Sequence, residues 1–173
     1  MKKLIVLALA SLSAATLFSA ENLLKNGTFE QMVAGSPAAW FTKTKSGITY
    51  SGDGAPESGY VKFDLVKDGK AVSANISQVV AKVVKSNGKY TISFKARTKN
   101  FKGMIRVLAI NDRWQKGDGL AIGGRFPKDW QEYKKNIVMP EFKKDARIVI
   151  MVSAKQGTVE IADVKLVPTE TAI

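Results

Sequence analysis

Much of the chain alternates between hydrophobic and polar residues with a period of two, which predicts β-strands with one face in a core. Residues 89–98 show this pattern most clearly, because every second side chain there is apolar. The apolar set is Tyr90, Ile92, Phe94 and Ala96, and the polar set between them is Thr91, Ser93, Lys95 and Arg97. Residues 157–167 repeat the pattern.

Two other segments are apolar almost throughout. Residues 147–154 form one of them, and residues 104–111 form the other, where Arg106 interrupts the run. Such runs are typical of strands that are covered on both faces. Residues 79–84 have a weak helical period, but their β-branched side chains favour a strand there too.

Turn residues separate these segments at intervals of roughly ten residues. Examples are Asn26-Gly27, Asp68-Gly69, Asn87-Gly88, Gly123-Gly124 and Gln156-Gly157. No linker, repeat or low-complexity tract divides the chain. We therefore predict a single all-β domain, a two-sheet antiparallel β-sandwich.

Residues 1–20 have the order of a secretory signal peptide. A basic start and a short apolar run, residues 4–12, are followed by small residues up to Ala20. The run is too short to span a bilayer by itself, so we predict cleavage after Ala20 and a sandwich domain over residues 21–173. Cleavage after Ala15 and retention as a membrane anchor are the alternatives. No later stretch is long and apolar enough to cross a membrane, and the predicted location is extracellular or periplasmic.

The composition excludes several kinds of site. The 173 residues include no His and no Cys. This removes Ser-His-Asp and Cys-His catalysis, zinc sites built on these residues, haem, iron–sulfur clusters and disulfides. Catalysis by carboxylates, Lys or Tyr, metal binding through oxygen ligands, and binding without chemistry remain open.

The chain is strongly basic. It has 27 Lys and Arg against 15 Asp and Glu, a formal net charge of +12 and a pI near 9.9. Such an excess favours polyanionic partners, which are nucleic acid, an anionic membrane surface or an acidic polysaccharide. Because the predicted signal peptide directs the chain out of the cell, we expect an acidic polysaccharide and no nucleic acid.

Five sequence features, in matching order, resemble those of carbohydrate-binding modules of families 4, 9 and 22. Residues 22–30, Asn-Leu-Leu-Lys-Asn-Gly-Thr-Phe-Glu, are similar to the opening of these modules. The later matching features are Trp40, the strand pattern at 90–98, the Trp130-x-x-Tyr133 pair before Pro140, and the closing residues 157–166. The resemblance covers nearly the whole predicted domain. It implies a jelly-roll sandwich with a galactose-binding-domain-like topology and a carbohydrate ligand.

The same resemblance implies a structural calcium site. In these modules an N-terminal acid and an Asp of the last strand often bind the ion, and Glu30 and Asp163 stand at those positions here. The modules carry two Asp residues where this chain has Ala162 and Asp163, and calcium takes six to eight oxygen ligands. A turn Asp and an exposed Glu paired with a Lys is the alternative interpretation.

The aromatic residues divide into core residues and candidate ligand contacts. Those expected in the core are Phe29, Trp40, Phe63, Tyr90, Phe94, Trp130 and Tyr133. Trp114 differs, because it follows Arg113 in the polar, Gly-rich loop 111–119. It is either a packing anchor of that loop or an exposed platform for a sugar ring. Tyr50 and Phe126 are lesser candidates.

The polar face of residues 89–98 supplies the basic candidates. Lys95 and Arg97 would lie there, and Arg106 would lie beside them if its strand is a neighbour. A basic face without aromatic lining favours a sulfated or uronic-acid glycan, because Arg contacts such groups with two parallel hydrogen bonds. An ordinary solvated face of Lys and Arg is the alternative.

These observations predict a secreted carbohydrate-binding protein that is not itself an enzyme, although it could be accessory to a separate glycoside hydrolase. Glycoside hydrolysis needs two carboxylates across a cleft, and no pair of acids shares a strand face at a useful spacing. A structural or adhesive protein that uses the sandwich for protein contacts is the second hypothesis. A polyanion binder held on its own cell envelope by charge alone is the third. The sequence predicts no oligomeric state.

Overall fold

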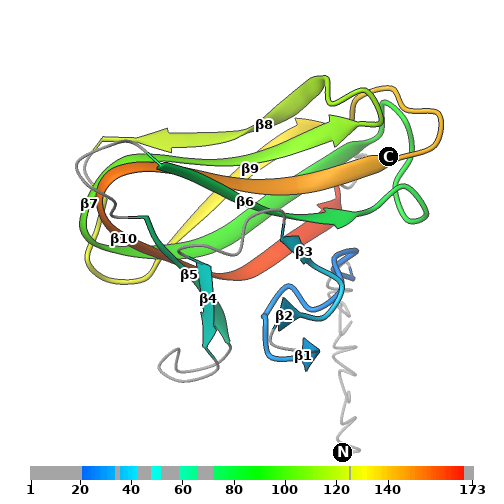
Figure 1. Cartoon of the computed structure of the whole chain (residues 1–173). Helices are drawn as coiled ribbons and strands as arrows, with labels where there is room; N and C mark the ends of the chain where they lie inside the picture. The colour runs from blue at the N-terminus through cyan, green and yellow to red at the C-terminus, as the bar shows by residue number, and fades with distance from the viewer. Residues whose placement is uncertain are drawn as a thin grey trace, which may run out of the picture.

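The computed structural model describes residues 21–33, 36–42, 48–51, 59–65, 72–124 and 126–169, which contain ten β-strands (Figure 1). The strands are β1 (Met32–Val33), β2 (Ser36–Pro37), β3 (Phe41–Thr42), β4 (Ile48–Ser51), β5 (Tyr60–Asp64), β6 (Val72–Val79), β7 (Lys89–Asn111), β8 (Lys116–Gly123), β9 (Gln131–Val138) and β10 (Ala146–Pro168). Within these ranges no helix is long and apolar enough to span a membrane. The predicted signal peptide, residues 1–20, lies outside the described residues.

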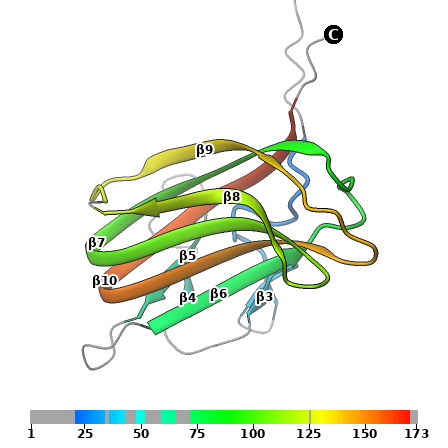
Figure 2. The same ribbon diagram turned by 90° about the horizontal axis from the view of Figure 1, so that it is seen from above.

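Apart from the short β1–β2 ribbon, the strands form two antiparallel layers that share their two longest strands, β7 and β10 (Figures 1 and 2). The first half of β7 lies between β9 and the second half of β10, which continues through β5 to β4. We call this layer the β9 sheet. The second half of β7 lies between β8 and the first half of β10, which continues through β6 to β3. This layer is the β8 sheet, and the predicted all-β sandwich is confirmed.

The core lies between the two sheets and consists of the inward-facing residues of each strand. In β7 the predicted apolar set from Tyr90 to Ala96 is buried, as are Ile105 and Val107 further along. Burial of this apolar surface is the main favourable term for the fold. The run 147–154 lies in the centre of the β8 sheet, where even the outward-facing Val149 is only 1% exposed. That position explains why the run is apolar almost throughout.

Both long strands bend where they pass from one sheet to the other, and register shifts interrupt their pairing there. Asn100 has a φ of 51° and Gly157 a φ of 79°. A Cβ on Gly157 would lie 2.3 Å from the Asn100 backbone, and one on Gly103 would lie 2.2 Å from a carbonyl oxygen of the facing strand. Glycine is required at both positions because the two backbones approach so closely. We call residues 99–103 and 154–158 the crossover bend.

The N-terminal motif, residues 22–30, attaches the start of the chain to its last strand. The side-chain oxygen of Asn22 accepts a hydrogen bond from the backbone N–H of Leu166 at 2.9 Å. The backbone oxygen of Asn26 accepts one from the indole Nε1 of Trp40 at 3.0 Å. The polar residues of the motif therefore satisfy hydrogen-bonding groups at this end of the sandwich.

Two secondary-structure expectations are corrected. Residues 79–84 do not continue as a strand, because β6 ends at Val79 and the backbone N–H of Val83 turns back to the Val80 oxygen at 2.9 Å. The segments 89–98 and 104–111 are one strand rather than two, and so are 147–154 and 157–167. The bend keeps the hydrogen-bonded pairing while it changes sheet, so the turn-like residues at 99–103 and 155–157 do not end the strands.

Candidate functional site

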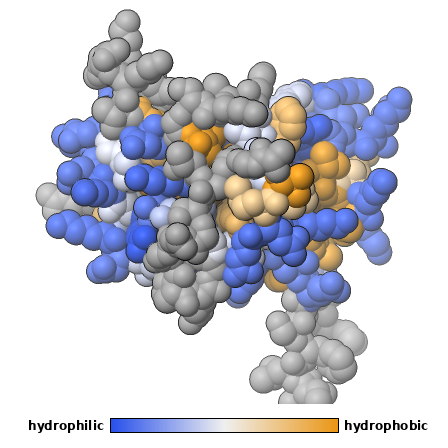
Figure 3. Space-filling model, turned by 60° about the horizontal axis from the view of Figure 1, so that its bottom comes forward, coloured by the Kyte–Doolittle hydropathy of each residue, from blue (hydrophilic) through white to orange (hydrophobic). Residues whose placement is uncertain are grey.

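An open hollow of about 520 Å³ lies beside the crossover bend, next to the outer face of the β9 sheet. Its lining residues are Lys62, Arg97, Thr98, Lys99, Asn100, Lys128, Thr158 and Glu160. A second hollow of about 370 Å³ shares Lys62, Lys99, Asn100 and Thr158 with the first. We treat the two hollows as one surface feature and call it the basic groove. In Figure 3, hydrophilic side chains cover the left of the view, the side where β7 and β10 bend in Figure 1, and the hydrophobic side chains lie mainly to the right of centre among further hydrophilic ones.

The Arg97 guanidinium, in the wall of the basic groove, is engaged by neighbouring side chains. Its Nε donates a hydrogen bond to the Glu160 carboxylate. Its central carbon lies 4.7 Å from the ring centroid of Trp130 and 5.8 Å from that of Tyr60. The two rings stand edge-to-face with centroids 6.3 Å apart. An ion pair and cation–π contacts therefore hold Arg97 in the wall.

Trp130 was expected in the core, and that expectation is wrong. The side chain is half-buried and lies outside the core cluster, against Arg97. Its indole Nε1 is buried and has no hydrogen-bond partner among the described residues. Because Arg97 lies over the ring, the groove presents charge at this point rather than a free aromatic face.

Lys62, Lys99 and Lys128 give the groove its excess of positive charge. None of them forms an ion pair with a described residue. Two acids also line the groove: Glu160 is paired with Arg97, and Asp64 lines the smaller hollow with Lys62 and Lys99. A lysine ammonium is a compact charge with three donors, suited to carboxylate and sulfate oxygens. Cations that line a concave surface raise the local concentration of anions.

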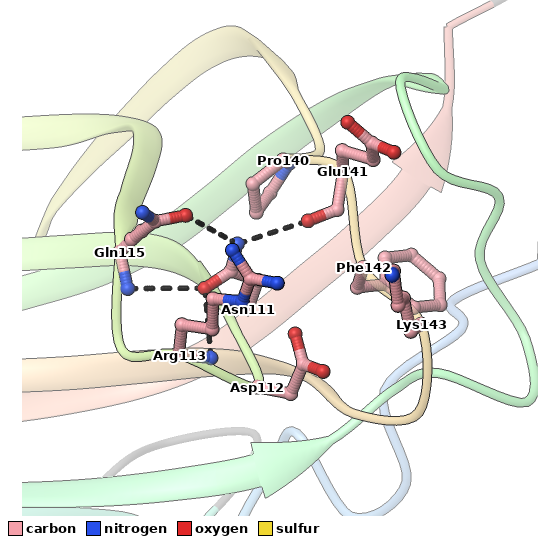
Figure 4. A pocket seen from close by; sticks show the side chains of 8 residues that line it. All are labelled: Asn111, Asp112, Arg113, Gln115, Pro140, Glu141, Phe142 and Lys143. Carbon is pink, nitrogen blue, oxygen red and sulfur yellow. Dashed lines mark hydrogen bonds between the residues drawn. The ribbon is translucent and has the colours of Figure 1, made fainter.

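Arg113 and Trp114 lie in the turn between β7 and β8, at the other end of the sandwich. With a rise of about 3.3 Å per residue, that turn is roughly 30 Å along β7 from the crossover bend. Trp114 is 59% exposed. A separate hollow of about 220 Å³ lies beside this turn (Figure 4). Phe126, the lesser aromatic candidate, instead packs against the core and stacks edge-to-face on Phe101 at 5.0 Å.

The other predicted ligand residues are not brought together. Lys95 lies on the outer face of the β9 sheet, with its Nζ 3.4 Å from the Asp163 carboxylate. Arg106 does not lie beside Arg97, because β7 changes sheet between them and Arg106 pairs with Met151 in the β8 sheet. Tyr50 belongs to β4, but its side chain is outside the described part of the structure.

The two predicted calcium ligands do not make up a calcium shell. Asp163 has a φ of 51°, and its two carboxylate oxygens lie 3.4 Å from Lys95 Nζ and 3.1 Å from Lys165 Nζ. Glu30 is exposed, and no cluster of three acids lies among the described residues. Calcium would have to displace both ammonium groups. The ion stays a prediction from the motif, and a melting midpoint that chelator leaves unchanged would remove it.

Sequence reasoning missed the three groove lysines and the position of Trp130. The groove residues come from segments around positions 62, 97–100, 128 and 158–160, which the topology brings together. No motif marks them, and only the overall excess of Lys and Arg indicates such a surface.

The fold is that of carbohydrate-binding β-sandwiches. A family 61 module in complex with β-1,4-galactotriose has a TM-score of 0.64 and 17% identity, over 87% of this chain and 100% of that one. The xylan-binding module CBM22-1 of Paenibacillus barcinonensis Xyn10C has a TM-score of 0.57 and 10% identity, over 88% and 97%. An arabinose-bound α-L-arabinofuranosidase has a TM-score of 0.65 and 16% identity over 87% of this chain, which spans only 27% of that enzyme.

The sequence itself matches a family as well. Residues 21–158 match the family described as a carbohydrate binding domain, of the family 4 and 9 type. The chain belongs to this family, so the resemblance noted in its motifs is confirmed. No curated protein matches the chain.

Proposed function

We propose that the chain is a secreted, non-catalytic carbohydrate-binding protein whose ligand is an acidic polysaccharide, bound along the basic groove. Membership of the family supports a carbohydrate ligand. The observation that carries the acidic preference is the set of three lysines around the hollow of about 520 Å³, Lys62, Lys99 and Lys128, which pair with no described acid.

An acidic polysaccharide matches the groove in shape and in charge. The larger hollow shares residues with the smaller one, so the surface suits a length of polymer rather than a single end unit. Repeated carboxylates or sulfates would contact successive lysines. Because these lysines are at the surface, added salt would weaken the contacts over a screening length of about 8–10 Å.

Isothermal titration with polygalacturonate and with neutral galactan tests the preference. At about 50 mM salt we expect polygalacturonate to bind at least about tenfold more tightly, because the groove lysines attract its carboxylates. At about 300 mM salt the advantage should shrink. Equal affinity for the two polymers, or a preference that salt does not change, would contradict the acidic ligand.

Export is tested by the mass of the protein recovered outside the cytoplasm. Cleavage after Ala20 predicts a chain that begins at Glu21. A chain that begins at Thr16 would indicate the alternative cleavage site. Full-length protein retained with the membrane would contradict secretion.

The proposal of binding without catalysis is supported by the state of Glu160. Glycoside hydrolysis uses a carboxylic acid and a carboxylate that can act on the same bond. Glu160 is instead committed to Arg97 in the wall of the groove. We expect no new reducing ends when polygalacturonate or galactan is incubated with the protein. If the wild-type chain released new reducing ends and the Glu160→Gln variant did not, the proposal would be contradicted.

A further inference from the structure

The turn that joins β7 to β8 places a tryptophan where glycine is usual. Asn111 and Gln115 are joined by a backbone hydrogen bond of 3.3 Å, and the N–H of Trp114 donates to the Asn111 oxygen at 2.9 Å. Residues 112–114 therefore form a three-residue hairpin loop, whose last residue adopts the left-handed region and is commonly glycine. Trp114 has a φ of 58°.

This arrangement has two energetic costs. A left-handed backbone is unfavourable for a residue with a Cβ. An indole that is 59% exposed also forgoes the gain from burial. Among the described residues no other aromatic ring packs on Trp114. Backbone strain of this kind at an exposed aromatic side chain points to a contact with another molecule.

Asn111 holds the turn rigid. Its side-chain oxygen accepts hydrogen bonds from the backbone N–H groups of Arg113 at 3.1 Å and Gln115 at 3.0 Å. Its Nδ2 donates to the side chain of Gln115 at 3.2 Å and to the backbone oxygen of Glu141 at 2.9 Å (Figure 4). Asn111 is 8% exposed, so this network is part of the folded frame. The position of Trp114 is set before any ligand arrives, which lowers the entropic cost of binding.

The hollow of about 220 Å³ beside this turn differs from the basic groove in its charge. Its lining residues are Asn111, Asp112, Arg113, Gln115, Pro140, Glu141, Phe142 and Lys143. Two cations and two acids balance one another. Carboxylate, amide and guanidinium groups supply both donors and acceptors, which suits the hydroxyls of an uncharged sugar.

We propose that Trp114 and this loop-end hollow form a second carbohydrate-binding site, which takes a short neutral sugar chain. Trp114 does not itself line the hollow, but its neighbours Arg113 and Gln115 do. One sugar ring would stack on the exposed indole, and the hydroxyls of a linked ring would bond to the polar groups of the hollow. The inference depends on the carbohydrate-binding role of the chain and not on the basic groove.

The three tryptophans provide one reporter for each region. Trp114 reports on the loop end, Trp130 on the basic groove through its contact with Arg97, and the buried Trp40 on the core. In nitrogen-15 NMR spectra, indole N–H resonances assigned with Trp→Phe variants separate the three regions. The probes are galactose, glucose, mannose and xylose, their neutral β-1,4-linked trimers, and trigalacturonate.

We expect at least one neutral trimer to shift the Trp114 resonance saturably, while Trp40 and Trp130 stay in place. Trigalacturonate should shift Trp130. No shift of Trp114 with any neutral probe, or a larger shift with trigalacturonate, would overturn the second site and leave the groove proposal standing. If a neutral trimer shifts Trp114 but trigalacturonate leaves Trp130 in place, the second site stands and the groove proposal is contradicted.

Trp114→Gly separates a binding role from a structural one. Because glycine suits the left-handed backbone, we expect this variant to melt at or above the wild-type temperature and to bind the neutral trimer at least about tenfold more weakly. Arg113→Ala should also weaken binding. Phe41→Ala, which removes another aromatic side chain that is 61% exposed, is the matched control and should bind normally. Unchanged affinity in Trp114→Gly, or an equal loss in Phe41→Ala, would overturn the proposal.

Discussion

Arg97 shows how a residue with the right charge for a ligand can be used by the fold instead. Its guanidinium is paired with Glu160 and covers the ring of Trp130 at 4.7 Å. Its side chain is 31% exposed and that of Glu160 is 17% exposed, so water screens the pair only in part. The planar group can pair with the carboxylate and stack on the indole together, whereas a lysine ammonium has no planar face.

Arg97→Lys therefore tests whether the side chain holds the wall or binds the ligand. We expect a loss of about 1 kcal/mol in stability, which is a drop of roughly 3 °C in Tm for a domain of this size. Affinity for polygalacturonate should stay within about twofold, because the positive charge is kept. Calorimetry and binding on the same sample measure both. An unchanged Tm with a large loss of affinity would assign Arg97 to the ligand instead.

A second pair, Lys135 and Asp118, joins the two sheets at their open edge. Lys135 Nζ in β9 donates to the Asp118 carboxylate at 2.6 Å and to the Gly119 oxygen at 2.8 Å, both in β8. The hydrogen bond from Lys135 holds the pKa of Asp118 below its ordinary 3.8. A carboxyl group with a lowered pKa contributes stability above its ordinary pKa, and this contribution is lost as the pH falls through the lowered value.

Asp118→Asn should therefore lower Tm at pH 7, and the difference from wild type should disappear well below pH 3.8. The two side chains are 43% and 37% exposed, so solvent screening limits the effect to less than about 1 kcal/mol. Thermal unfolding at neutral and strongly acidic pH measures the difference. A deficit of equal size at both would show that the charge of Asp118 is not its cause.

The crossover bend is the element on which the sandwich depends, because β7 and β10 carry both sheets. Gly157→Ala would place a Cβ 2.3 Å from the Asn100 backbone at a φ of 79°. We expect a loss of about 3 kcal/mol or more. Gly124→Ala is the matched control, with a φ of 97° and no heavy atom within 4 Å of the added Cβ. It should lose only about 1 kcal/mol, from backbone strain alone.

Denaturant unfolding of the two variants measures this difference. Similar losses would mean that the close approach of the two strands at Gly157 does not contribute to stability. A normal melting curve for Gly157→Ala would also contradict the geometry of the bend.

The strands could be predicted to the extent that local pattern decides them. The alternation from Tyr90 to Arg97 predicted one apolar face in the core, and the apolar run 147–154 predicted a covered strand, as observed. On the outward face, Thr91 and Ser93 are buried as well, and only Lys95 and Arg97 are partly exposed. The passage of β7 through Asn100 into the second sheet could not be predicted. Its polar and Gly-containing residues have the composition of a turn, and only pairing with β10 keeps them in a strand.

The candidate site was less predictable, because it depends on contacts between distant segments. Trp114 could be singled out, since a lone indole in a polar loop has no apolar neighbours to bury it. Arg106 was expected beside Arg97 only if its strand is a neighbour, and the sequence could not decide this because the bend between the two residues was not visible in it. Lys62 and Lys128 meet at one groove only through the pairing of β5 with β10 and of β9 with β7.

At the level of the whole molecule, two different surfaces lie at opposite ends of the sandwich. The basic groove has an excess of cations, whereas the charges around the loop-end hollow balance. A protein with both sites could hold an acidic polymer at one end and a neutral sugar at the other. Part of the excess of Lys and Arg that gives the chain its net charge of +12 therefore lies in the groove beside the crossover bend.

The most direct measurement is the affinity for polygalacturonate of the triple variant Lys62→Ala/Lys99→Ala/Lys128→Ala. Its matched control removes three exposed lysines at the far end of the molecule, in Lys82→Ala/Lys85→Ala/Lys144→Ala. Both variants have the same net charge. We expect at least about a tenfold loss in the groove variant and less than about a threefold loss in the control. Equal losses would show that overall charge, and not the basic groove, holds the polymer.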